Sequence, residues 1–89
     1  MPAYTVVRYE GKALPQLRLF CSLHGIEHII QGNALFFDYT YKHLGQARRH
    51  AIDDYIEHCD DIGATEFDIE WIAGEKFAYA VSMFSVTDS

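Results

Sequence analysis

Spacing of hydrophobic and polar residues along the first third of the chain predicts a strand followed by a short helix. Residues 3–9 are rich in β-branched and aromatic side chains, and the run closes at Gly11, as expected for a strand. Residues 14–24 instead have their apolar side chains at helical spacing. Pro15 is tolerated in the first turn of that helix, and Gly25 is a natural stop.

The middle of the chain predicts a hairpin and then the longest helix. Residues 26–31 and 34–41 flank Gly32 and Asn33, a two-residue turn of the kind that hairpins favour. From residue 44 to about residue 62 the apolar positions return to helical spacing. The apolar stripe of this helix consists of Ala51, Ile52, Tyr55, Ile56, Cys59 and Ile62.

The last third predicts two more strands. Acids alternate with large apolar residues over residues 66–71, and large and small residues alternate over residues 77–83. An odd-numbered loop between the two strands sets their apolar side chains on one face, away from the carboxylates. That face would carry Phe67, Ile69, Trp71, Phe77, Tyr79 and Val81. The outer face would carry Glu66, Asp68 and Glu70 beside Ala78, Ala80 and Ser82.

These elements predict a single α+β domain that covers residues 1–89. Its class is ferredoxin-like βαββαβ with an extra C-terminal strand, in which two helices pack on one face of an antiparallel sheet. The other face of such a sheet can remain in water. A chain of 89 residues with 49% apolar composition has enough apolar surface for one modest core and too little length for a second domain.

Composition indicates a soluble chain that stays in the cytoplasm. No apolar stretch approaches the roughly 20 residues that a membrane span requires. Residues 1–8 lack the cationic start and apolar block of a secretory signal. Cys21 and Cys59 are too few for a disulfide scaffold, and each fits a buried free thiol in a helix better than a bridge between helices.

The acids are unevenly distributed. The chain carries 13 acidic and 7 basic residues, for a net charge of −6, and nine of the acids lie between His50 and Lys76 without a Lys or Arg among them. These acids are Asp53, Asp54, Glu57, Asp60, Asp61, Glu66, Asp68, Glu70 and Glu75. Five of them fall within about 12 Å of helix, one per about 2.4 Å, whereas duplex DNA carries one charge per about 1.7 Å.

Helix stability does not account for this charge arrangement. Arg48 and Arg49 lie near the positive end of the predicted helix. Its negative end carries Glu57, Asp60 and Asp61, and this arrangement is the reverse of what the helix dipole favours. Each misplaced charge costs about 0.3 to 1 kcal/mol at low salt. The acids are either an ordinary solvated face that favours solubility or a phosphate-like surface that binds a basic cleft.

A metal site has weak support, and no cofactor is expected. The residues with suitable ligand chemistry are Cys21, His24, His28, His58 and Cys59. Gly25 interrupts the helix between His24 and His28, and no C-x-x-C pair is present. Core or surface positions therefore suit these residues better than a zinc site.

Residues 32–39 loosely resemble the aromatic strand signature of RNA-recognition motifs, but the basic residue of that signature is missing. Tyr4 would supply a second stacking platform. A net charge of −6 opposes binding to phosphate chains, so we favour core positions for Leu35, Phe37 and Tyr39 and expect no direct contact with nucleic acid.

Catalysis is not expected either. The chain lacks a G-x-S-x-G nucleophile motif, a phosphate-binding glycine loop, a dinucleotide fingerprint and an H-E-x-x-H metal motif.

We therefore expect a non-enzymatic acidic protein-binding module, an inhibitor or adaptor that occupies the basic nucleic-acid-binding cleft of a partner protein. Small acidic proteins of this kind are often made by viruses against host defences, so a viral anti-defence protein is expected. The expected contact residues are Asp53, Asp54, Glu57, Asp60, Asp61, Glu66, Asp68 and Glu70. The alternative is a small regulatory or ligand-binding domain that forms a homodimer through a strand edge or through the face of Ala78, Ala80, Ser82 and Phe84, with Phe84 as the anchor.

Overall fold

The computed structural model of the protein describes residues 3–58, 63–70 and 76–88, and the side chains of 3, 70 and 83–88 lie outside this description. The elements are β1 (Ala3–Tyr9), α1 (Leu14–Leu23), β2 (His28–Gln31), β3 (Ala34–Asp38), α2 (Tyr41–His58), β4 (Ala64–Glu70) and α3 (Phe77–Asp88). The fold is therefore α+β, as predicted, and the first six elements follow the predicted order.

Local sequence accounts for two of the boundaries that shape the site. Gly32 has a φ of 62° in the turn between β2 and β3, a left-handed conformation that glycine adopts without steric cost. Gly45 has a φ of 78° and divides α2 into a first turn and the longer helix that follows it. The acids of α2 all lie in this longer part.

The four strands form one antiparallel sheet in the order β2-β3-β1-β4. The central strand β1 pairs with β3 on one side, where Val7 lies opposite Phe37. On its other side β1 pairs with β4, where Val6 lies opposite Phe67 and Val7 lies opposite Glu66. The free edges of the sheet are β2 and β4.

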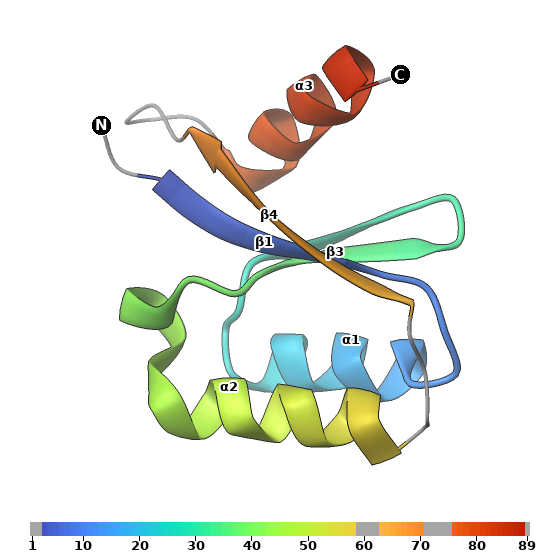
Figure 1. Cartoon of the computed structure of the whole chain (residues 1–89), viewed down its shortest axis with the longest axis vertical. Coiled ribbons are helices and arrows are strands. Elements are labelled where there is room, and N and C mark those ends of the chain that lie inside the picture. Colours follow the sequence, from blue (N-terminus) through green and yellow to red (C-terminus); the bar gives the residue numbers. More distant parts are fainter. Residues whose placement is uncertain (1–2, 59–62, 71–75, 89) are drawn as a thin grey trace.

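Helices cover both faces of the sheet (Figure 1). On one face α1 and α2 pack over a core that includes Tyr9, Leu17, Leu35, Phe37 and Ile52. The predicted packing of these two helices on one face is correct. The second face does not remain in water, because α3 covers it around Val6, Phe36 and Ile69 together with its own Phe77 and Val81.

The predicted fifth strand is wrong, because residues 77–88 form the helix α3. Phe77, Ala80 and Val81 are buried, which is the i, i+3, i+4 spacing of one helix face, whereas Tyr79 is 54% exposed. The alternating pattern counted Tyr79 as a core residue and Ala80 as a surface residue. The flat strand face predicted for self-association therefore does not exist.

The acids on β4 were predicted to lie on the face of the sheet opposite α1 and α2, and this orientation is also wrong. Residues that pair across antiparallel strands share a face of the sheet. Glu66 pairs with Val7 and Asp68 pairs with Thr5, so both acids point to the face that α1 and α2 cover. Phe67 and Ile69 point to α3 instead. The predicted core position of Trp71 lies outside the described residues.

No helix within residues 3–58, 63–70 and 76–88 combines the length and the apolar character needed to cross a bilayer.

Candidate acidic binding surface

Three of the predicted contact residues are exposed on α2. Leu44 and Ile52 are buried against the sheet, with Ile56 partly buried beside them, and this helical spacing fixes which side of α2 faces the core. The acids at intervening positions are each exposed: Asp53, Asp54 and Glu57. Their exposure agrees with the helical pattern in the sequence.

Two more predicted contact residues, Glu66 and Asp68, are exposed on the edge strand β4. They lie on the side of the sheet that α1 and α2 cover. Glu70 ends β4, where its backbone pairs with Ala3. The predicted contacts Asp60 and Asp61 lie outside the described residues. The name acidic face is used below for Asp53, Asp54, Glu57, Glu66 and Asp68.

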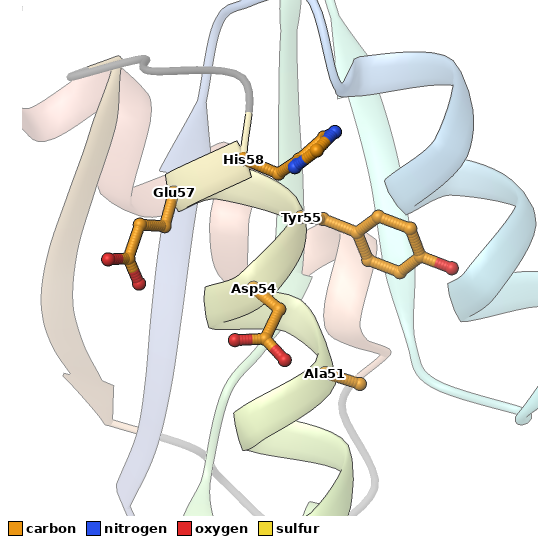
Figure 2. Close-up of a pocket in the computed structure, with 5 residues that line it drawn as sticks. All are labelled: Ala51, Asp54, Tyr55, Glu57 and His58. Carbon is orange, nitrogen blue, oxygen red and sulfur yellow. The ribbon is translucent and has the colours of Figure 1, made fainter.

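Side chains on α2 diverge around the helix (Figure 2). Tyr55 and His58 point toward α1, and the Tyr55 ring lies 5.8 Å from that of Phe20 on α1. Glu57 points away from α1, to the side on which β4 is drawn, and Asp54 projects from the outer surface of the helix. The carboxylates of Asp54 and Glu57 therefore occupy the outer surface and the side toward β4.

Shallow hollows follow the outer surface of α2. One is lined by Ala51, Asp54, Tyr55, Glu57 and His58. The next shares Ala51 and Asp54 with it and continues past His50 toward the start of the helix. The open surface along α2 therefore has shallow hollows lined in part by carboxylates.

Basic side chains do not neutralise the acidic face in the described part of the chain. The ion pairs between described residues join Arg8 to Glu10 and His43 to Asp38, and neither involves the acidic face. Asp68 accepts a hydrogen bond from the Thr5 hydroxyl at 3.0 Å, a contact that leaves its charge in place. The surface therefore keeps its negative charge for interactions with other molecules.

Asp53 differs from the other acids because it also has an internal role. Its Oδ1 accepts a hydrogen bond of 2.5 Å from the hydroxyl of Tyr39, whose ring is buried. Burial, the hydrogen bond to Asp53 and the charge of Asp53 raise the pKa of Tyr39 to about 12, against an opposing effect of Arg49. Asp53 thus fixes α2 to the end of β3 in addition to its place on the acidic face.

Comparison of the chain with protein-family models, curated proteins and solved structures finds no match.

The sequence patterns missed a polar cluster where β3 ends. Asp38 is buried, and its carboxylate accepts a hydrogen bond from the Thr40 N–H at 2.9 Å and lies 2.7 Å from His43 Nδ1. The His43 ring packs edge-on against Tyr4 at 4.7 Å. Burial, then Asp38, then Glu27 raise the pKa of Tyr4. The only signal of this cluster in the sequence was Asp38, an acid that interrupts an apolar strand two residues before Thr40.

The residues considered for metal binding have other contacts. Cys21 is a free, buried thiol, and burial followed by the charge of Asp38 raises its pKa to about 12, so the thiolate form that binds metals is scarce at neutral pH. The His24 ring packs on Phe20, and His28 Nδ1 lies 2.8 Å from the carbonyl oxygen of Ile26. No group of three potential ligands comes together among the described residues. Cys59 lies outside them.

The aromatic strand that resembles an RNA-recognition signature is unavailable for base stacking. All five residues of β3 are buried, because α1 and α2 cover one face and α3 covers the other. Leu35 and Phe37 are core residues, as we favoured, and Tyr39 is 7% exposed.

Proposed function

We propose that the protein is a non-enzymatic binding module that presents the acidic face to the basic nucleic-acid-binding surface of a partner protein. The observation that supports this proposal is that exposed carboxylates from α2 and β4 lie on the same side of the sheet and form no ion pair with a Lys or Arg among the described residues. Inhibition of the partner, by exclusion of its nucleic acid, follows from occupancy of the same surface.

Two physical effects favour such a complex. A cluster of like charges attracts an oppositely charged surface over distances of about a Debye length, roughly 10 Å at 0.1 M salt, and accelerates encounter. The shallow hollow on α2 then allows contact around Asp54 and Glu57, from which water is displaced. Charge supplies the rate and specificity of binding, and the fit of the surfaces supplies much of its lifetime.

The proposal also includes the fold class of the protein and its site of action. We assign the sheet order β2-β3-β1-β4, with α1 and α2 on one face, to the ferredoxin-like class, with α3 as an addition. We also propose that the protein is not an enzyme and that it acts in the cytoplasm.

Competition with nucleic acid tests the proposal. The protein is used to capture partners from a host extract at low salt, and duplex DNA or RNA is then titrated against the purified complex. We expect nucleic acid to displace the protein from its partner. A partner that binds both at once, without loss of affinity for either, would refute the proposed occupancy.

Self-association remains the alternative, now without the strand face first predicted for it. The observation in its favour is the exposure of two leucines one turn apart on α1, Leu19 at 60% and Leu23 at 72%. Apolar self-association predicts a dimer whose mass persists at high salt, which light scattering coupled to gel filtration measures. A monomer at about 100 μM protein removes this alternative.

A further inference from the structure

Arg49 stacks on aromatic rings instead of pairing with an acid. Its guanidinium carbon lies 4.1 Å from the centroid of the Tyr39 ring and 5.6 Å from that of Tyr41. Its Nε is buried and has no hydrogen-bond partner. The described ion pairs do not include Arg49, although the chain has 13 acids.

The acid best placed to neutralise Arg49 has another partner. Asp53 lies one turn further along the same helix, at a spacing that suits ion pairs. Its Oδ1 instead accepts the hydrogen bond from the Tyr39 hydroxyl. The guanidinium thus lies over the Tyr39 ring without an ion pair among the described residues, so its charge is available to a ligand.

A hollow of about 290 Å³ opens at this arginine. It is lined by Tyr39, Tyr41, Gln46, Arg49, His50 and Asp53. Tyr41 is 55% exposed, so its ring offers a flat apolar wall beside the polar groups. A concave site with an aromatic wall and a few convergent polar groups is the usual form of a small-molecule site.

We propose that this hollow binds a small organic carboxylate. Arg49 donates paired hydrogen bonds to the two carboxylate oxygens, and the Tyr41 ring packs against the apolar body of the ligand. Asp53 lines the same hollow and repels anions in proportion to their charge, which favours a monoanionic carboxylate over a phosphate dianion. The hollow shares Asp53 with the acidic face, but the binding of a carboxylate in it does not require the proposed partner.

The test uses benzoate, acetate and inorganic phosphate as probes of the whole protein at low salt, followed by backbone amide chemical shifts. Benzoate is expected to bind saturably, with shifts centred on residues 39–53, more tightly than acetate, which lacks the ring, and than phosphate. Arg49→Gln should weaken benzoate binding at least tenfold, and Arg49→Lys, which keeps the charge but loses the planar donor pair, should also weaken it.

Arg48→Gln is the matched control, because Arg48 lies next to Arg49 but bonds to the Leu44 carbonyl oxygen at 3.4 Å and does not line the hollow. Its benzoate affinity should stay within twofold of the original. Absence of saturable benzoate binding, equal losses in both glutamine variants, or tighter binding of phosphate would overturn the proposal. If Arg49→Gln does not fold, Tyr41→Ala and Arg49→Lys give the same discrimination.

Discussion

Neighbouring acids on α2 differ in the contacts that their carboxylates make within the protein. On the side of the helix near Tyr39, Asp53 accepts a short hydrogen bond and Arg49 stacks over the same ring, so both charges help to fix α2 to the sheet. On the outer side, Asp54 and Glu57 make no hydrogen bond or ion pair with described residues, although they line the hollows of that surface.

The density of charge along the chain therefore overstates the number of carboxylates that are available to a partner. The first acid of the helix contributes to the fold, whereas the acids that follow are free of internal contacts among the described residues. Substitutions that separate these two sides of α2 therefore test folding and binding independently. A substitution of Asp53 would change folding as well as binding, so Asp53 is not suited to a test of binding alone.

The largest expected effect comes from the buried side of α2. Ile52→Ala removes a side chain with no exposed surface and should lower the free energy of unfolding by about 2 to 5 kcal/mol. Ile56→Ala, at a partly buried position, should cost less. Urea denaturation followed by circular dichroism measures both. Equal losses for the two variants would show that α2 is rotated relative to this account.

The side near Tyr39 should show the next largest effect. Tyr39→Phe removes the hydrogen bond to Asp53 and should cost about 1.5 kcal/mol, a value typical of bonds to charged groups. Tyr41→Phe is the control, since its ring is exposed and its change should remain within about 0.5 kcal/mol. Similar stabilities for the two variants would mean that the Tyr39–Asp53 contact does not hold α2 in place.

The same contact predicts a dependence on pH. The unfolded chain releases the phenol proton of Tyr39 near pH 10, whereas the folded chain, in which the pKa is about 12, retains it. The folded state thus binds more protons between these values, and stability falls as the pH rises from 10 to 12. The stability difference between the original protein and Tyr39→Phe, measured across this window, isolates the effect. A constant difference would exclude a raised pKa.

The smallest expected effect on stability belongs to the outer side. Asp54→Asn combined with Glu57→Gln should change the free energy of unfolding by no more than about 0.5 kcal/mol, with a slight gain because Glu57 lies near the negative end of the helix. Thermal denaturation at low salt measures this change. A loss above 1 kcal/mol would place these acids among the residues that hold the fold.

The sequence predicted the elements whose signals do not conflict. The bounds of β1 agree with the pattern, and the glycines after α1 and between β2 and β3 mark real boundaries. Residues 77–83 carried two compatible periods, since Phe77, Tyr79 and Val81 suit a strand while Phe77, Ala80 and Val81 suit a helix. Contact with the second face of the sheet decided in favour of the helix, and no local pattern contains that information.

The candidate site was predictable to a similar extent. Exposure of Asp54 and Glu57 follows from helical spacing against the buried Ile52. The contact between Tyr39 and Asp53 joins residues 14 positions apart and depends on how α2 crosses the end of β3, which spacing along the chain does not determine. The orientation of Glu66 and Asp68 was not predictable either, because it depends on the packing of α3 against the second face of the sheet.

The central claim is that the outer acids of α2 are binding charges, and the most direct test is the salt dependence of affinity for the captured partner. From about 50 to about 200 mM salt the affinity of the original protein should fall steeply. Asp54→Asn with Glu57→Gln should bind more weakly at 50 mM and with a shallower dependence. The control Glu10→Gln with Glu27→Gln removes the same charge elsewhere and should behave like the original. Identical affinity and salt dependence in all three proteins would contradict the account.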